Sequence, residues 1–84
     1  MSDLAQRFAA AQATIKPFTQ LGTDRQLELY GFFKQATVGD VSGPRPGMMD
    51  LRGRAKYDAW AKRKGLAKDA AMQAYIDLVA KHTR

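Results

Sequence analysis

The residues best suited to chemistry in this chain are aromatic side chains with a lysine nearby. Tyr30 and Lys34 are four residues apart, so they lie side by side on the flank of a helix. Lys56 repeats the combination beside Tyr57 and Trp60. A phosphate needs several converging donors, and a purine needs a flat ring on which to stack. The two segments fit an adenine nucleotide with extra phosphates or a nucleic acid; the plain alternative is that the rings belong to a helical core.

Catalytic and metal-binding patterns are missing from the sequence. His82 is the single histidine, and a set built on paper with Ser42 lacks the glycine frame of a nucleophile elbow. There is no cysteine, no pair of acids at calcium-loop spacing, and no Gly-Lys-Ser or Gly-Lys-Thr after the loop glycines. We therefore expect a binding protein that is not an enzyme and that uses no metal and no cofactor.

Positive charge is concentrated in one stretch of the chain. The 84 residues include 14 Lys and Arg against 8 Asp and Glu, which gives a formal net charge of +6. Residues 45–68 hold eight of these bases and two of the acids. Such a stretch attracts anions, which include nucleic acid, acidic lipid and phosphorylated small molecules. A solvated basic helix face is the alternative interpretation.

The size of the chain and its first residues indicate a small soluble domain. Eighty-four residues suffice for one small core, so we expect a single domain over residues 1–84. Residues 1–7 lack the basic start and apolar run of a signal peptide, and no apolar stretch approaches the length of a membrane span. Together with the absence of cysteine, this predicts a cytoplasmic protein without stable membrane insertion.

The spacing of apolar residues predicts four helices and no strands. The expected ranges are 3–15, 23 to about 38, 51 to about 64, and 67 to about 82. A capping box formed by Thr23 and Gln26 would begin the second helix, and Asp50 would cap the third. Gly39 and Gly65 are placed to end the second and third helices. The sequence therefore predicts an all-α protein.

A long loop is expected between the second and third helices. Residues 39–50 contain three glycines and two prolines, which rule out regular structure, and loops of this length are often functional. Met48 and Met49 are expected to tuck into the bundle or to contact an apolar ligand, because methionine adapts to irregular surfaces. Gly53, early in the third helix, is expected to let another backbone or a ligand come close.

Several motifs, taken together, match a known family. In chain order they are Tyr30-x-x-x-Lys34-Gln35-Ala36-Thr37-Val38-Gly39-Asp40, Arg45-Pro46-Gly47-Met48, Gly53-x-Ala55-Lys56-Tyr57-Asp58-Ala59-Trp60, Lys64-Gly65 and Ala71-Met72-x-Ala74-Tyr75-Ile76-Asp77. With them the chain resembles the acyl-CoA-binding protein (diazepam-binding-inhibitor-like) family from Tyr30 to Val79. The resemblance implies a four-helix bundle of up-down-down-up topology that binds medium- to long-chain fatty acyl-CoA thioesters without acting on them.

The resemblance also implies a ligand site by position. Tyr30, Lys34 and Lys56 would hold the 3′-phosphate of the CoA ribose. Phe33 would face the adenine, and Lys16 would lie near the CoA head group. The remaining implied positions are Gly31, Phe32 and Tyr75, with Arg54 and Met48 as secondary candidates.

Three positions depart from the usual pattern of the family. Phe33 stands where a tyrosine is usual, so stacking can survive but a hydroxyl hydrogen bond cannot. Arg54 replaces a common lysine and keeps the charge. Ala67 replaces the usual Ser or Thr at the start of the fourth helix, a loss of about 0.5–2 kcal/mol that Asp69 in the first turn partly offsets. None of the three changes the class of ligand.

The family role would be intracellular transport or buffering of the acyl-CoA pool. We expect a cytoplasmic monomer with fatty acyl-CoA as its partner, transient contact with enzymes that use acyl-CoA, and no binding of nucleic acid. Two other hypotheses remain open at this point. One is a small basic domain that binds nucleic acid through residues 45–68, and the other is an accessory protein of an acyltransferase or thioesterase.

Overall fold

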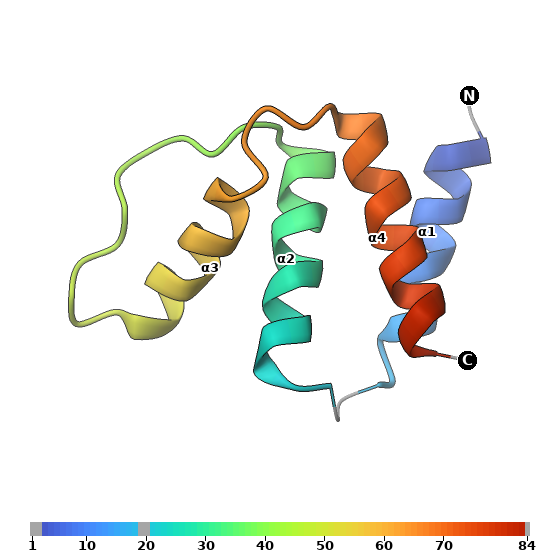
Figure 1. Ribbon diagram of the computed structural model, residues 1–84, viewed down its shortest axis with the longest axis horizontal. Helices are drawn as coiled ribbons and strands as arrows, with labels where there is room; N and C mark the ends of the chain where they lie inside the picture. The colour runs from blue at the N-terminus through green and yellow to red at the C-terminus, as the bar shows by residue number, and fades with distance from the viewer. Residues whose placement is uncertain (1–2, 19–20, 84) are drawn as a thin grey trace.

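The computed structural model describes residues 3–18 and 21–83, and this part of the chain contains four α-helices and no strand. The helices are α1 (Asp3–Ile15), α2 (Thr23–Thr37), α3 (Leu51–Ala61) and α4 (Lys68–His82). Helices α2 and α3 run in one direction and α1 and α4 in the other, which confirms the up-down-down-up topology (Figure 1). Residues 1, 2, 19, 20 and 84, which fall within the expected domain and its first connector, lie outside the described residues.

The four helices stand in a row rather than around a central axis. Helix α4 packs between α1 and α2, and α3 packs on the outer side of α2 (Figure 1). The molecule is flat, with principal-axis extents of 38 × 29 × 15 Å. Helix α2 therefore presents side chains to both broad faces of the row.

The hydrophobic core lies where α1, α2 and α4 meet. Phe8 packs edge-on against Tyr75, with ring centroids 5.1 Å apart, and stacks on Phe33 at 6.1 Å. The buried members of this cluster are Phe8, Ala11, Leu29, Ala36, Ala71, Tyr75 and Val79. None of them comes from α3, whose buried residue is Ala59. Hydrogen bonds from the long loop must therefore help to hold α3 in place.

Of the two side-chain caps predicted from the sequence, that of α3 is confirmed and that of α2 is wrong. Asp50 caps α3, because its carboxylate accepts a hydrogen bond of 2.9 Å from the Gly53 amide. Helix α4 begins after Ala67 without a side-chain cap. The capping box of α2 does not form: the N-cap is Gly22, and the Gln26 amide donates to the Leu21 carbonyl at 2.9 Å instead. Gly22 is already extended, so Thr23 becomes the first helical residue and cannot act as the cap.

The long loop is held against α3 by side chains of that helix. The Trp60 indole donates a hydrogen bond of 2.7 Å to the Gly39 carbonyl, and the Tyr57 hydroxyl donates one of 2.9 Å to the Gly43 carbonyl. Arg45 forms two hydrogen bonds with Asp58, at 2.9 and 2.6 Å. This bidentate contact lowers the pKa of the Asp58 carboxyl. Tyr57 and Trp60 thus hold the loop in place through hydrogen bonds from their polar atoms.

A second group of hydrogen bonds joins the start of the long loop and the connection between α3 and α4 to α2. Gln35 is buried, and its amide donates to the Asp40 carboxylate and to the Leu66 carbonyl, each at 2.8 Å. The same Asp40 oxygen accepts from the Gly65 amide at 2.8 Å. Gly39 has φ of +102°, a conformation that favours glycine and lets the chain turn sharply as α2 ends. Asp40 therefore connects the end of α2 with the segment that leads into α4.

Two expectations for the loop and for α3 are wrong. Met48 and Met49 do not tuck into the bundle, because their side chains are 80% and 96% exposed. The contacts of Gly39, Gly43 and Arg45 hold the loop against α3, and the chain then turns outward before it enters the helix. Gly53 admits neither a distant backbone nor a ligand. The space that a side chain would fill there is taken by the capping carboxylate of Asp50.

Among the described residues, no helix is long and apolar enough to cross a membrane. In residues 3–18 and 21–83, no group of three or more His, Cys, Asp or Glu side chains could hold a metal ion.

Candidate functional site

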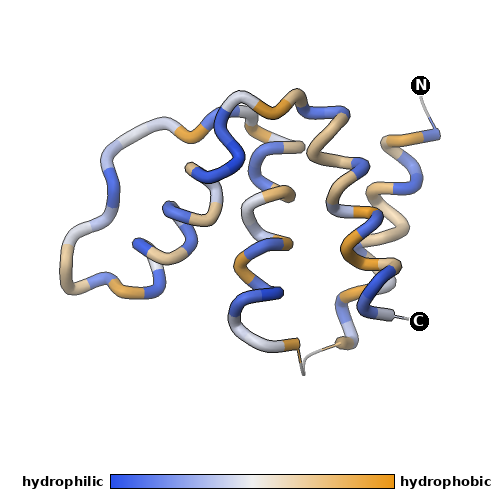
Figure 2. Tube along the Cα trace, in the orientation of Figure 1, coloured by the Kyte–Doolittle hydropathy of each residue, from blue (hydrophilic) through white to orange (hydrophobic). Residues whose placement is uncertain are grey.

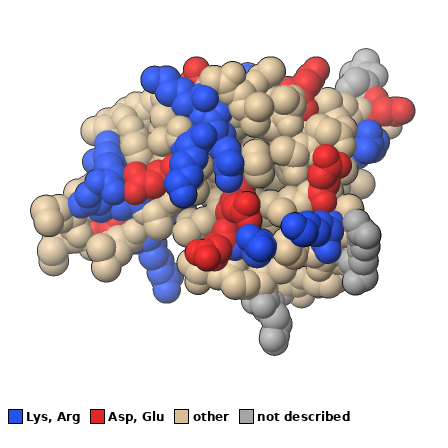
Figure 3. Space-filling view, in the orientation of Figure 1, with Lys and Arg blue, Asp and Glu red and all other residues tan. Residues whose placement is uncertain are grey.

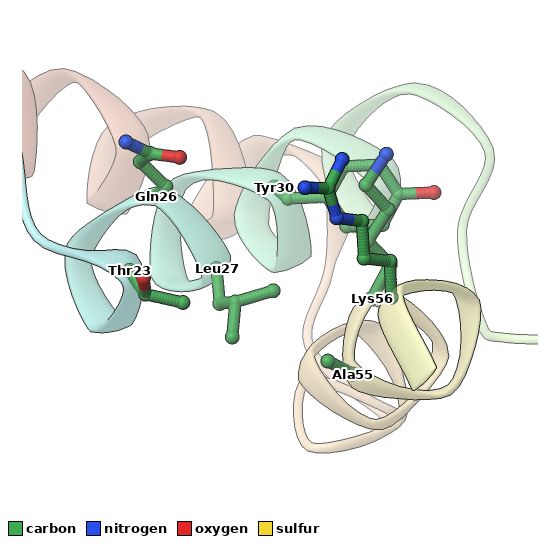
Figure 4. Close-up of a pocket in the computed structure, with 7 residues that line it drawn as sticks. Thr23, Gln26, Leu27, Tyr30, Ala55 and Lys56 are labelled. Atoms are coloured by element: carbon green, nitrogen blue, oxygen red, sulfur yellow. The ribbon is translucent and has the colours of Figure 1, made fainter. Parts of the chain in front are cut away.

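A groove between α2 and α3 contains two of the predicted site residues. It has a volume of about 510 Å³, and the side chains of Tyr30 and Lys56 come together at one end of it (Figure 4). Leu27 and Ala55 supply apolar surface from the two facing helices. The full lining is Thr23, Gln26, Leu27, Tyr30, Arg52, Ala55 and Lys56. We call this the α2–α3 groove.

Two lysines reach across the contact between α2 and α3 to aromatic rings. The Lys56 ammonium lies 5.5 Å from the centroid of the Tyr30 ring, and the Lys34 ammonium lies 4.9 Å from the Trp60 ring. Lys56 also lines the α2–α3 groove, whereas Lys34 and Trp60 do not. The structure therefore brings Tyr30, Lys34 and Lys56 together on two facing helices, although 22 residues separate Lys34 from Lys56 in the sequence.

A second groove lies between α1, α2 and α4. Its volume is about 480 Å³, and it is lined by Gln12, Ala13, Ile15, Lys16, Phe33 and Tyr75. Phe33 and Tyr75 offer aromatic surface, with ring centroids 6.4 Å apart. Burial raises the pKa of the Tyr75 hydroxyl, so it stays protonated at neutral pH and can donate a hydrogen bond. Lys16 directly follows α1 and is exposed. We call this the ring groove.

The two grooves are neighbours on one face of the row of helices. Tyr30 lines the first groove, and Phe33 lines the second. Three residues of a helix correspond to a rotation of about 300°, which is about 60° short of a full turn, so the two side chains point in directions about 60° apart. Tyr30 and Lys56 line the first groove, and Lys34 follows Tyr30 by one turn of α2. A ligand that spans both grooves would pass beside them.

Five predicted residues do not line either groove, and one of them, Lys34, lies over the Trp60 ring instead. Gly31 is buried against α3, where an added Cβ would stand 2.5 Å from the Ala59 carbonyl oxygen. Phe32 points toward the other face of α2, with the Arg63 guanidinium 4.1 Å from its ring centroid. The other two residues, Arg54 and Met48, are absent from the lining of both grooves.

Some lining residues are ones that the sequence analysis missed. Leu27 precedes Tyr30 by three residues, and Arg52 precedes Lys56 by four, so both share a helix face with a predicted residue. Gln12 and Ala13 line the ring groove from α1. Helical spacing from Tyr30 and Lys56 was the signal for Leu27 and Arg52. No such signal exists for Gln12 and Ala13, because they depend on where α1 packs.

The arrangement can recognise one ligand by three kinds of contact. Aromatic rings line one groove, and aliphatic side chains line the other together with the Tyr30 phenol and the Lys56 ammonium. The Lys34 ammonium lies one helical turn beyond Tyr30. These are the features of a site for non-covalent binding of a molecule with a flat ring, an anionic group and an apolar part. The fold and the site together define a helical binding protein for an amphiphilic, anionic ligand.

Comparison with known sequences gives the family. The profile of the family described as "Acyl CoA binding protein" matches residues 5–79. The chain therefore belongs to the acyl-CoA-binding protein family, and the resemblance noted in the sequence is confirmed.

Relatives and solved structures agree with this assignment. The chain is 52% identical over 73 residues to "Acyl-CoA-binding protein homolog 1" of Caenorhabditis elegans, covering 86% of this chain and 85% of that protein. It is 44% identical over 77 residues to "Acyl-CoA-binding protein homolog" of Drosophila melanogaster, covering 90% of each. The crystal structure of Oryza sativa Acyl-CoA-Binding Protein 2 superposes with a TM-score of 0.90 at 38% identity, covering 93% of this chain and 88% of that one.

Proposed function

We propose that this protein binds medium- to long-chain fatty acyl-CoA thioesters and carries or buffers them without catalysing a reaction. Membership of the family and the names of the relatives support the ligand class. The structural observation that carries the proposal is the pair of lysines, Lys34 and Lys56, each held over a ring of the facing helix, with Lys56 and Tyr30 lining the α2–α3 groove.

The 3′-phosphate of CoA would bind at Tyr30, Lys34 and Lys56. A cation over an exposed ring is worth about 0.5–1 kcal/mol, whereas a hydrogen bond to a charged group contributes about 1.5–3 kcal/mol. Both ammonium groups would therefore leave their rings in favour of a phosphate. The rings hold the lysines near the required position beforehand, which reduces the entropy lost on binding.

The two grooves would divide the rest of the ligand. The adenine would stack on Phe33 in the ring groove, with Tyr75 and Lys16 beside the head group. The acyl chain would lie along Leu27 and Ala55 in the α2–α3 groove. A buried methylene contributes about 0.8 kcal/mol, so ten of them approach about 8 kcal/mol before ordering costs. Chain length would therefore set the affinity, and the phosphate contacts would select CoA over free fatty acid.

The remaining expectations are part of the same proposal. Residues 1–84 would form one acyl-CoA-binding domain that works as a monomer in the cytoplasm and meets acyl-CoA-using enzymes only briefly. Two basic residues of the 45–68 stretch have contacts within the fold. Arg45 is paired with Asp58, and Lys56 lies over Tyr30.

Calorimetric titration with acyl-CoA esters of increasing chain length tests the proposal. Affinity should rise steadily over the medium-to-long range, and CoA alone should bind weakly. Leu27→Ala should reduce the gain per added methylene, because it removes apolar surface from the α2–α3 groove. Leu51→Ala is a matched control, since Leu51 is 76% exposed and lies outside the groove. A series with no dependence on chain length would contradict the buried-chain arrangement.

A further inference from the structure

Three large apolar side chains stand uncovered at the outer end of the molecule. Met48, Met49 and Leu51 are 80%, 96% and 76% exposed, and they fall within four consecutive residues where the long loop enters α3. We call them the apolar tip. This end of the molecule lies farthest from α1 and α4, and hydrophobic residues mark it beside the polar start of α3 (Figure 2). Single exposed apolar residues are ordinary, but a contiguous set on a projection indicates an interaction site.

The tip is presented by a well-defined turn. The Asp50 amide donates to the Gly47 carbonyl at 3.0 Å, and the Asp50 carboxylate accepts from the Gly53 amide at 2.9 Å. These two bonds fix the backbone on both sides of Met49. The apolar side chains therefore project outward from an ordered turn, and little further ordering of the backbone is needed when they are covered.

Positive charge surrounds the apolar tip. Residues 45–56 contain four bases and one acid, and that acid, Asp50, is engaged in the helix cap. Arg45 is paired with Asp58, which leaves Arg52, Arg54 and Lys56 to give this end of the molecule its positive charge. Lys and Arg side chains lie next to uncovered tan atoms at this end of the molecule (Figure 3).

We propose that the apolar tip docks on the surface of an anionic lipid bilayer. The tip is convex, so it needs an apolar medium that yields around it and not a pre-shaped pocket in a partner. The interfacial region of a bilayer accepts such side chains, while its acidic head groups attract the flanking bases. Each base near an anionic surface is worth about 1 kcal/mol, which is about fivefold in affinity.

Docking at the tip would also bring the α2–α3 groove to the lipid surface. Arg52 and Lys56 follow the tip along α3 and line that groove. An amphiphile that leaves the bilayer could then enter the groove without crossing bulk water. This consequence rests on the proposed function, whereas docking itself does not.

A fluorescent label at the tip gives a direct test. The chain has no cysteine, so Met49→Cys can be labelled at one position with an environment-sensitive dye. Vesicles of phosphatidylcholine with phosphatidylserine should shift the emission to the blue, and vesicles of phosphatidylcholine alone should shift it much less. Val38→Cys is the matched control, because Val38 is an exposed apolar residue at the other end of the loop. An equal shift at both positions would overturn the assignment to the tip.

Removing the apolar side chains separates docking from ligand binding. In vesicle co-sedimentation, Met48→Ser with Met49→Ser should weaken binding about tenfold or more, because two exposed methionines lose their apolar partner. The affinity of the double variant for acyl-CoA in lipid-free solution should equal that of the wild type. If the wild type itself does not bind acyl-CoA, the proposed function is wrong, but the docking proposal is not affected. Val38→Ser should bind vesicles like the wild type.

Two outcomes overturn the proposal. Vesicle binding that the double substitution leaves intact would show attraction by charge without insertion of the tip. The second outcome is a wild-type chain that binds neither kind of vesicle but whose sedimentation coefficient rises with protein concentration. If replacing Met48 and Met49 abolishes this rise, the partner of the tip is a second copy of the chain.

Discussion

Neighbouring residues of one motif have different roles in this protein: some are candidates for ligand binding, and others hold the helices together. Lys34 and Lys56 each lie over an aromatic ring of the opposite helix, so the contact between α2 and α3 orients both ammonium groups. Gly31 follows Tyr30 in the motif but serves the contact with α3. Its missing side chain leaves room for the Ala59 carbonyl.

Replacing Lys56 should separate the phosphate contact from the rest of the ligand. Lys56→Ala should weaken palmitoyl-CoA binding about 10- to 100-fold, because one hydrogen bond to a charged group is lost. The analogue without the 3′-phosphate should lose much less. Lys62→Ala is a suitable control, since Lys62 is exposed and lines neither site groove. Equal losses for both ligands, measured by calorimetry, would remove Lys56 from the phosphate site.

At the scale of elements, the long loop owes its position to a few polar contacts in its first half. Gln35 and Asp40 connect the end of α2 with Gly65 and Leu66, and Trp60 and Tyr57 hold the loop on α3. The specific run from Lys34 to Asp40 thus includes one ligand candidate, Lys34, followed by residues that position the loop.

The carboxylate of Asp40 should make stability depend on pH. Hydrogen bonds from the Gly65 amide and, next, from Gln35 lower the pKa of Asp40 below its ordinary 3.8. Between the two pKa values, the unfolded chain therefore binds more protons than the folded chain. The stabilisation by Asp40 is fully present above the ordinary pKa, and it is lost as the pH falls through the lower pKa that Asp40 has in the folded protein. Asp40→Asn should therefore lower the free energy of unfolding at neutral pH.

Urea denaturation checks this expectation. The difference between Asp40→Asn and the wild type should shrink when the pH falls well below 3.8, since the wild-type carboxyl is then protonated as well. Asp77→Asn is the control, because Asp77 bonds to Gln73 within one helix and connects no loop. A difference that stays constant from neutral pH into strong acid would show that the charge of Asp40 does not matter.

At the scale of the whole molecule, α3 is the outer layer of a row and contributes no side chain to the core cluster. Elements with few buried apolar contacts open first. Amide hydrogens of α3 should therefore exchange faster with solvent than those of the central turns of α2 and α4. Acyl-CoA, which would contact both Tyr30 and Lys56, should slow exchange in α3 most. Exchange in α3 as slow as in α2 without ligand would contradict this order.

The sequence by itself determined the features that depend on neighbours along the chain. Apolar spacing predicted all four helices, although α3 ends at Ala61 because residues 62–65 continue as turns. Asp50 was identified as a cap because a cap depends on residues within one turn. The motifs from Tyr30 to Asp77 identified the family, because many residues at set spacings must agree at once.

Only the tertiary structure decided which distant groups meet. Trp60 bonds to the Gly39 carbonyl, 21 residues away, and no spacing rule announces that contact. The same folding of the loop onto α3 sends Met48 and Met49 outward, although their apolar character predicted burial. The α2–α3 groove likewise depends on a helix contact that only Gly31 allows to be so close. Local patterns specify helices, whereas the positions of helices and loops follow from packing and from hydrogen bonds between residues far apart in the sequence.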